Sequence, residues 1–393
     1  MVSLSFIAAV FLFHLPLILA VCSCMYHLAV FCAALQFRCK PEEEASSDFA
    51  PPVSILKPVH GIEQGFYSGL ASHFRQDYPH FEIVFGLSGS KDPAQWTIAQ
   101  LRRDFPHVPV KVVTMEDAGS AHRKRANPKM NKLEPMLEQA EHEIVLMNDS
   151  DISVESDYLR QVVRPLRNPR TGLVTCLYRG VPAGGIVSIL ESLGISGDFA
   201  GQVLLARSVK GVRFALGATL VTRKKQIAEI GGLAPWADYL ADDYILGNKI
   251  AAAGYPVHLS HTVVDTTVPR RSFFEMFRHQ LRWARTIRFS NPRGYPALLL
   301  TFGIPLALVA LLFRPDSPLA QAVLAGTLAA RFLAAWASGV LVCRDRVMRK
   351  FFWLLPIRDL VALGVWITSF MGNHVVWRGE RFRIEAGGKI KPV

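Results

Sequence analysis

A long apolar stretch opens the chain. From Leu4 to Phe37 there is no Asp, Glu, Lys or Arg, and the run exceeds the roughly 20 residues that a membrane-spanning helix needs. A cleaved signal peptide is the alternative, but no basic residue precedes the run, which is far longer than a typical signal core. Arg38 and Lys40 follow directly, so the positive-inside tendency predicts an outside N-terminus and a cytosolic position after Lys40.

Three more apolar stretches occupy the C-terminal quarter, at residues 295–313, 319–342 and 351–371. The first two predict a hairpin across the bilayer. The third contains Arg358 and Asp359, and basic residues lie on both of its sides. Because both flanks favour the cytosol, a re-entrant or interfacial segment is predicted; the alternative is a straightforward span that places the C-terminal tail outside.

Between about Pro51 and Pro269, short apolar runs alternate with amphipathic stretches. The runs predict strands at residues 53–56, 82–87, 110–113 and 143–147. The stretches between them predict helices at residues 65–75, 94–105 and 133–140. This alternation is typical of a parallel sheet covered on both faces, so we predict a doubly wound, Rossmann-like α/β domain whose ligands bind beyond the carboxyl ends of the strands.

The composition supports a membrane protein but does not identify what the protein binds. The 393 residues are 50% hydrophobic, and 44 Lys+Arg against 32 Asp+Glu give a net charge of +12. A basic balance is compatible with nucleic acid, phosphorylated ligands or anionic lipid. The arginines concentrate beside the apolar stretches, which membrane topology explains better than nucleic-acid binding. The six cysteines fit neither a zinc spacing nor a disulfide framework, so no metal or redox role is predicted for them.

Two carboxylates, Asp149 and Asp151, follow the fourth predicted strand. In an extended chain, residues two positions apart point to the same side, so both side chains can converge on one cation. A hard divalent ion, Mg²⁺ or Mn²⁺, is the natural occupant, because it binds one or two carboxylates together with diphosphate oxygens. The alternative is that these aspartates only cap the next helix.

Two further acidic positions lie before predicted helices. Asp92 follows the second strand and precedes Pro93, so it lies at the same sheet edge and is also a good helix N-cap. Asp242 and Asp243 begin a helix predicted to end near Gly254. They either offset the helix dipole, or one of them is a general base that accepts a proton from an attacking hydroxyl.

An amphipathic helix is predicted from Arg271 to Arg288, directly before the first C-terminal apolar stretch. Aromatic and aliphatic side chains line one side, and arginines cluster on another: Phe273, Phe274, Phe277, Leu281 and Ala284, against Arg271, Arg278, Arg282 and Arg285. Such a helix lies in the bilayer interface, with its arginines facing lipid phosphate or a diphosphate in an active site. An anchor without catalytic contact is the alternative.

In chain order, these residues resemble the D, DxD, D and QxxRW or RxxRW motifs of inverting, family-2-like glycosyltransferases with a GT-A fold. The matching positions are Asp92, Asp149, Asp151, Asp243 and the stretch His279-Gln280-Leu281-Arg282-Trp283. More narrowly, the chain resembles the ceramide glucosyltransferase family and its bacterial relatives that glycosylate hopanoids. The supporting stretches are VSILKPVHG at 53–61, QDYP at 76–79, DPA at 92–94, NPKMN at 127–131 and WRGERFR at 377–383. His279 departs from the pattern, which has Gln or Arg there; Arg278 or Gln280 could replace it in space.

The resemblance implies transfer of a hexose, glucose from UDP-glucose first, to the hydroxyl of a membrane lipid with inversion of configuration. Ceramide is the first acceptor, and a hopanoid polyol with glucose or N-acetylglucosamine the alternative. The resemblance assigns donor binding to Lys57, Asp92, Lys129, Asn131, Asp149 and Asp151, the divalent cation to Asp149 and Asp151, and the base to Asp243. It places Arg282 and Trp283 over the diphosphate or at the acceptor entrance, with Asp242, His279 and Gln280 as further candidates.

Two other functions remain open from sequence alone: a processive polysaccharide synthase, which shares the four motifs but needs more spanning helices, and a non-catalytic membrane scaffold. The predicted organisation is an anchor at 1–40, a GT-A catalytic domain at 41–269, an interfacial helix at 270–290, membrane segments at 291–374 and a basic cytosolic tail at 375–393. We therefore expect a multi-pass membrane protein with a cytosolic catalytic domain, in a bacterial inner membrane or, in a eukaryote, the Golgi or the endoplasmic reticulum.

Overall fold

The computed structural model describes residues 4–39, 49–116 and 125–393. The chain divides into two compact units. The first unit contains residues 1–40, 184–211 and 270–373, and the second contains residues 41–183, 212–269 and 374–393. The predicted organisation divided the chain into consecutive segments, whereas each of these two units combines segments that are far apart along the chain.

The second unit is built on an eight-stranded sheet with the order β3-β2-β1-β4-β7-β6-β8-β5. Its strands are β1 (Val53–Pro58), β2 (Phe81–Leu87), β3 (Val110–Thr114), β4 (Ile144–Met147), β5 (Ile152–Ser153), β6 (Leu173–Pro182), β7 (Leu220–Arg223) and β8 (Val257–Val268). β3, β2, β1 and β4 are mutually parallel, as predicted. β7 is antiparallel to both β4 and β6, so the complete sheet is mixed.

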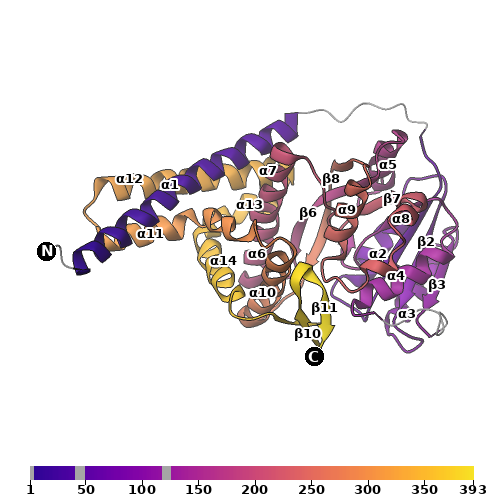
Figure 1. Cartoon of the computed structure of the whole chain (residues 1–393). Helices are drawn as coiled ribbons and strands as arrows, with labels where there is room; N and C mark the ends of the chain where they lie inside the picture. Colours follow the sequence, from indigo (N-terminus) through magenta and orange to yellow (C-terminus); the bar gives the residue numbers. More distant parts are fainter. Residues whose placement is uncertain (1–3, 40–48, 117–124) are drawn as a thin grey trace. The chain divides into compact units, whose positions relative to one another are not determined.

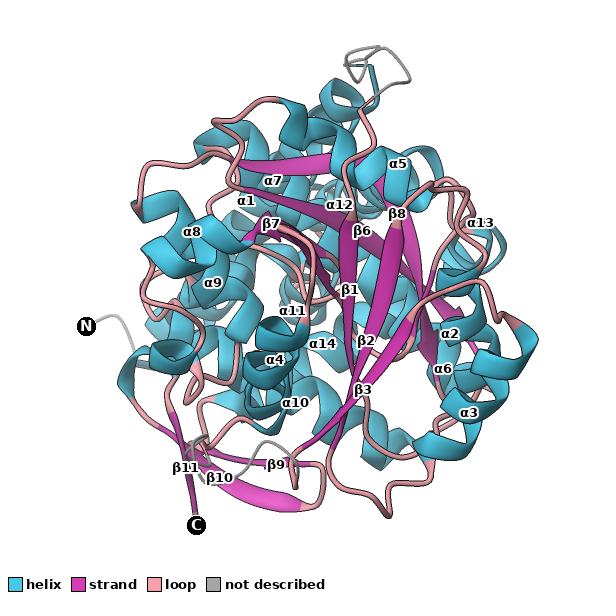
Figure 2. Ribbon diagram, turned by 90° about the vertical axis from the view of Figure 1, so that its right-hand side faces the viewer, coloured by secondary structure: helices cyan, strands magenta, loops and turns pink. Residues whose placement is uncertain are grey.

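Helices cover both faces of this sheet. They are α2 (Phe66–Phe74), α3 (Ala94–Asp104), α4 (Pro128–Gln139), α5 (Tyr158–Val163), α8 (Lys224–Glu229) and α9 (Asp242–Ala252). Figure 2 shows α4 on one side of β1, β2 and β3, with α2 and α3 on the other. Apolar strand residues such as Ile55, Phe85 and Leu146 are fully buried between these layers, which confirms the predicted α/β architecture.

The C-terminal residues form a small antiparallel sheet rather than the expected tail. Its strands are β9 (His374–Trp377), β10 (Glu380–Ile384) and β11 (Ile390–Pro392). Arg378 and Gly379 make the β9–β10 turn with φ of 52° and 82°, the left-handed pair that two-residue hairpins favour. Backbone hydrogen bonds from Leu240 N to Gly388 O (3.1 Å) and from Ile390 N to Asp238 O (2.8 Å) join this sheet to the loop before α9.

The first unit holds the apolar helices. These are α1 (Leu4–Cys39), α11 (Gly303–Phe313) and α12 (Pro318–Ala335), the last extended by a π-helix at Trp336–Val342. Figure 1 shows α11 and α12 lying along α1. Among the described residues, three helices are long and apolar enough to cross a membrane: Leu12–Cys39, Pro318–Val342 and Arg346–Ser369. The predicted span at 295–313 is broken: a 3₁₀ helix at Tyr295–Thr301 and α11 meet at 66°.

The charged residues of the third C-terminal stretch are neutralised by partners. This stretch contains α13 (Arg346–Phe351) and α14 (Leu355–Ser369). Arg331 of α12, only 2% exposed, binds Asp359 of α14 through Nη2 (2.8 Å to Oδ1) and also pairs with Asp198. Arg358 Nη2 lies 3.4 Å from Asp198 Oδ2. Two acids and two bases thus balance, which makes burial of these charges among apolar helices tolerable.

Residues 184–211, predicted within the catalytic domain, belong to this first unit. They form α6 (Ile186–Leu193), a π-helix at Gly194–Phe199 and α7 (Ala200–Lys210). α7 packs against α1, where Ser208 Oγ donates to Gln36 Oε1 (3.0 Å). α10 (Phe273–Ser290) confirms the predicted amphipathic helix and begins with a capping box between Ser272 and Glu275.

Candidate functional site

The carboxyl ends of β1 and β4 bring Lys57, Asp149 and Asp151 together in the second unit. The chain turns at Ser150 and Asp151 instead of remaining extended, so simple alternation does not set the directions of the two carboxylates. Lys57, fully buried, donates from Nζ to the backbone oxygen of Asp149 (2.7 Å). Burial lowers the pKa of Lys57 to about 7, although Asp151 and Asp149 act to raise it. The charges of both aspartates therefore act on this lysine.

Asp151 is anchored by β8. Its Oδ2 accepts a hydrogen bond from Thr266 Oγ1 (2.7 Å), and its backbone oxygen accepts from Thr267 N (3.1 Å). Burial and the neighbouring Asp149 raise the pKa of Asp151 to about 6, against the opposing hydrogen bond from Thr266. Such a raised pKa indicates concentrated negative charge, which a divalent cation would relieve.

Lys129 links the DxD stretch to the start of α9. Its Nζ lies 2.8 Å from Asp149 Oδ1 and 3.0 Å from Asp242 Oδ2. Burial alone lowers the pKa of Lys129, but the carboxylates of Asp149, Asp242 and Asp243 outweigh it and raise that pKa. Asn127 caps α4 by accepting hydrogen bonds from the backbone N of Lys129 and Met130, which fixes the lysine at the first turn.

Gly217 lies beside the carboxylates of both Asp149 and Asp243. A β-carbon built on Gly217 would lie 3.0 Å from Asp149 Oδ2 and 3.3 Å from Asp243 Oδ2. Burial and Asp242 raise the pKa of Asp243 to about 6, while Lys129 lowers it. Because Gly217 has no side chain, a carboxylate oxygen of Asp149 and one of Asp243 can both approach the space beside it.

Tyr178 of β6 was not predicted as part of the site. Burial raises the pKa of its hydroxyl strongly, and Asp243, Asp149 and Asp151 raise it further, in that order of effect. The charges of all three carboxylates that the sequence singled out therefore act on this one phenol. Nothing in the local sequence around Tyr178 indicated this, since its strand is antiparallel to β7 and lies outside the predicted parallel half.

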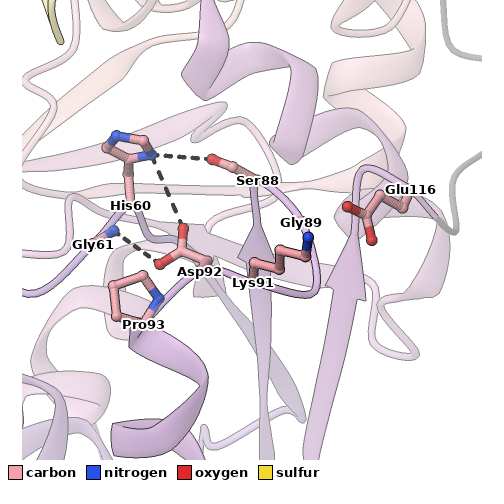
Figure 3. A pocket seen from close by; sticks show the side chains of 8 residues that line it. All are labelled: His60, Gly61, Ser88, Gly89, Lys91, Asp92, Pro93 and Glu116. Atoms are coloured by element: carbon pink, nitrogen blue, oxygen red, sulfur yellow. Dashed lines mark hydrogen bonds and ion pairs between the residues drawn. The ribbon is translucent and has the colours of Figure 1, made fainter.

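Asp92 lines a separate pocket of about 360 Å³ at the ends of β1, β2 and β3. Figure 3 shows its Oδ1 accepting from the backbone of Gly61 (3.0 Å), with His60 bound to Ser88 (3.1 Å) above it. The same Oδ1 accepts from Ala94 N (3.1 Å), so Asp92 also caps α3, as the sequence suggested. The mouth carries Lys91 and Glu116, which gives this pocket both charges.

Two basic residues near Asp92 were missed. Lys132 of α4 is 2% exposed and donates to the backbone oxygen of Val59. Burial lowers its pKa to about 8, Arg378 lowers it further, and Asp92 opposes both. Arg378, at the tip of the β9–β10 hairpin, also lowers the pKa of His60, after burial. The C-terminal WRGERFR stretch therefore brings a positive charge to the Asp92 pocket.

Asn131, predicted to bind the donor, has its side chain committed to the backbone. Its Oδ1 accepts from Arg125 N (2.9 Å) and its Nδ2 donates to Arg125 O (2.9 Å). This double contact fixes the residues that lead into α4, and so supports Lys129 indirectly. Both polar atoms of the Asn131 side chain are therefore engaged within the chain.

The motif His279-Gln280-Leu281-Arg282-Trp283 lies on α10, in the first unit. Gln280 is 7% exposed, and the ring of His279 lies 4.7 Å from that of Trp283, centroid to centroid. Arg282 is half-buried on the same helix. These residues do not belong to the unit that holds the aspartates, and within their own unit His279 contacts Glu191 of α6.

Known proteins resemble the chain over nearly its whole length. The model of glycosyl transferase family 21 matches residues 15–390. Ceramide glucosyltransferase 3 of Caenorhabditis elegans is 25% identical over 367 residues, covering 90% of this chain and 76% of the relative. Ceramide glucosyltransferase 1 of the same organism is 22% identical over 371 residues, covering 87% and 73%. The solved mannosyltransferase PcManGT from Pyrobaculum calidifontis, in complex with GDP-Man and Mn²⁺, has a TM-score of 0.50 at 20% identity, covering 90% of this chain and 99% of that one. This last likeness supports the GT-A fold.

Proposed function

The chain belongs to glycosyl transferase family 21 and is a glycosyltransferase, and we propose that it transfers glucose from UDP-glucose to the hydroxyl of ceramide with inversion of the anomeric centre. The observation that carries this proposal is the convergence of Asp149, Asp242 and Asp243: Lys129 Nζ lies 2.8 Å from Asp149 Oδ1 and 3.0 Å from Asp242 Oδ2, and Gly217 lies beside both Asp149 and Asp243. The acceptor follows from the two worm relatives, both named ceramide glucosyltransferases, which align along most of the chain.

The donor occupies the edge formed by β1, β2 and β4. Its nucleoside lies in the Asp92 pocket, where His60 and Gly61 line one wall. Lys129 and Lys57 supply positive charge beside the DxD turn, where the diphosphate lies. This arrangement follows the general rule that ligands of such sheets bind beyond the carboxyl ends of the strands.

Asp149 and Asp151 would hold a divalent cation together with the diphosphate. Both carboxylates belong to the DxD turn, and the similar mannosyltransferase was solved with Mn²⁺ and a sugar nucleotide. When bound, the cation supplies positive charge that stabilises the departing diphosphate. Thr266 fixes the Asp151 carboxylate, and Lys129 fixes that of Asp149, so neither must reorganise during the reaction.

Asp243 is the general base. Its raised pKa, about 6, leaves it ionised at neutral pH yet more basic than an ordinary aspartate, which suits removal of a hydroxyl proton. Asp242 is engaged by Lys129, so the adjacent carboxylates have separate tasks. Attack by the activated hydroxyl opposite the leaving diphosphate is a single displacement and inverts the anomeric centre.

The membrane topology follows from a parity argument. The C-terminal sheet and the β1–β8 sheet belong to one unit, so the chain crosses the membrane an even number of times between Pro269 and His374. Three candidate segments lie there, and they cannot all cross. Because α11 and α12 lie along α1, we assign the two crossings to them and place Arg346–Ser369 on the cytosolic side without a crossing. Arg38 and Lys40 put the catalytic unit in the cytosol.

The lipid reaches the site from the bilayer interface. On α10, Phe273 and Phe274 are 52% and 65% exposed, and Arg278 stacks over the ring of Phe274 at 4.7 Å. An exposed aromatic face beside arginines is the composition of a helix that lies among lipid headgroups. The ceramide hydroxyl then needs only to reach headgroup level, while its chains remain in hydrocarbon.

Purified protein tests this proposal directly. The wild type, Asp151→Asn and Asp243→Asn are incubated with UDP-glucose or UDP-N-acetylglucosamine and with ceramide, a polyol hopanoid or diacylglycerol, and products are identified by mass spectrometry. We expect hexosylceramide from the wild type with added Mn²⁺ or Mg²⁺, and losses of at least about 100-fold in both variants. Unchanged transfer by both variants would mean that the carboxylates are only structural.

A further inference from the structure

Glu191 of α6 is a buried carboxylate with two cationic or ionisable partners on another segment. It is 3% exposed, and its Oε1 lies 2.7 Å from His279 Nδ1. Arg271 Nη1 donates to both carboxylate oxygens, at 3.1 and 3.2 Å. Burial acts to raise the pKa of Glu191, but the bonds from His279 and Arg271 outweigh it and lower the pKa, so the group is ionised.

An ionised Glu191 determines the tautomer of His279. Glu191 Oε1, at 2.7 Å, is closer to Nδ1 than Arg271 Nη1, at 3.1 Å, and a carboxylate only accepts hydrogen bonds. Nδ1 therefore carries the ring proton and donates it to Glu191, while Arg271 donates to the carboxylate. Burial lowers the pKa of His279, Arg282 and Arg271 lower it further, and Glu191 opposes them. The ring is therefore neutral at neutral pH, and its second nitrogen, Nε2, presents a lone pair.

That second nitrogen is available. Among the residues that the structure describes, Nε2 of His279 makes no hydrogen bond, and the side chain is 22% exposed. The Trp283 ring, 4.7 Å away, limits the rotation of the imidazole from a second direction. A carboxylate that pins one ring nitrogen while the other faces outward is an arrangement that prepares histidine to accept a hydrogen bond.

We propose that Glu191 is a positioning residue that holds His279 so that its Nε2 accepts a hydrogen bond from a hydroxyl of the lipid acceptor. This inference rests on the proposed function, and it names the residue that recognises the acceptor headgroup. The same helix carries the exposed rings of Phe273 and Phe274, an apolar surface for the chains of such a lipid. At the position where related motifs have Gln, an amide oxygen would accept the same hydrogen bond without needing a carboxylate behind it.

A double-mutant cycle separates this role from simple packing. Glu191→Gln, His279→Gln and the double variant are purified, and the KM for ceramide, the KM for UDP-glucose and kcat are measured for each. We expect Glu191→Gln to raise the ceramide KM about three- to tenfold, the loss of one hydrogen bond, with the UDP-glucose KM unchanged. In the His279→Gln background, adding Glu191→Gln should change the ceramide KM by less than about twofold, because the glutamine needs no carboxylate behind it.

Several outcomes would overturn the inference. If Glu191→Gln raises the ceramide KM equally in both backgrounds, the carboxylate acts through Arg271 or through packing and not through His279. If it raises only the UDP-glucose KM, the dyad serves the donor. Should Glu191→Gln fail to fold, His279→Ala with an unchanged ceramide KM would be equally decisive against the inference. Absence of transfer by the wild type would instead refute the proposed function.

Discussion

Substitution of Gly217 by alanine tests whether the transfer reaction depends on the positions of the Asp149 and Asp243 carboxylates beside this glycine. The added methyl carbon would lie 3.0 Å from Asp149 Oδ2 and 3.3 Å from Asp243 Oδ2. Both distances are tighter than ordinary contacts, so the carboxylates must move by a few tenths of an ångström. Gly217 does not have a left-handed backbone, so alanine is tolerated there without backbone strain.

The expected effect on activity exceeds the effect on stability. Replacing glycine by alanine where the backbone permits it stabilises a fold by about 0.4–1 kcal/mol, so the variant should fold. Misplacing reacting groups by about 1 Å costs roughly 100-fold in rate. A smaller displacement of the proposed cation ligand Asp149 and the proposed base Asp243 should therefore lower kcat/KM about 10- to 100-fold and raise the Mn²⁺ concentration needed for half-maximal activity.

The assay is initial-rate glucosyl transfer by purified protein across a Mn²⁺ titration, with the thermal unfolding midpoint measured in parallel. Gly326→Ala is the matched control, because a β-carbon there meets open space. If Gly217→Ala retains activity within about twofold and the same Mn²⁺ dependence, the transfer reaction does not depend on the positions of Asp149 and Asp243 beside Gly217. A lowered midpoint with an unchanged rate would likewise contradict the reasoning.

Three further predictions concern stability and topology. Arg331→Met leaves Asp198 and Asp359 with Arg358 as their remaining charge partner. This change should lower the free energy of unfolding by about 3–5 kcal/mol, measured as a lower unfolding midpoint in detergent. The double variant Arg331→Met/Asp359→Leu should recover part of that loss. In a cysteine-free background, Asp316→Cys should react with a membrane-impermeant maleimide in intact cells. Trp96 and Met371 are exposed, and Trp96→Cys and Met371→Cys should react only after the membrane is permeabilised. Labelling of Met371→Cys in intact cells would mean that Arg346–Ser369 crosses the membrane. Burial lowers the pKa of Lys132 to about 8 from 10.5, so the unfolded chain binds more protons between these values and stability should rise with pH there; Lys132→Met should flatten that rise in the unfolding midpoint, and an unchanged slope would refute the assignment.

The first half of the sheet could be predicted because β1, β2 and β4 are almost fully buried and form largely apolar runs, and because β3, half-buried at the sheet edge, is rich in valine. The second half could not. β6 has a register shift between Cys176 and Leu177, and β8 mixes buried and half-buried positions, so neither gives a clear period. The segment 184–211 falls inside the range 41–269 that was predicted as the catalytic domain, and its packing against α1 places it in the first unit.

The residues of the site were likewise predicted only in part. Asp92, Asp149, Asp151 and Asp243 were predicted because each follows a strand or begins a helix, positions that sequence pattern identifies. Tyr178 and Gly217 were missed, since their importance comes only from contact with carboxylates far away in the sequence. His279 was noticed as a departure from a motif, but its buried partner Glu191 lies 88 positions earlier and carries no motif of its own.

The anomeric configuration of the lipid product tests the central claim most directly. UDP-glucose carries an α-linked sugar, so a single displacement assisted by Asp243 at the cation-binding edge yields β-glucosylceramide. Nuclear magnetic resonance of the product made by purified protein with Mn²⁺ should show only the β-anomer, and Asp243→Asn should yield almost none. A product with the α-anomer, or equal yield from Asp243→Asn, would contradict the account.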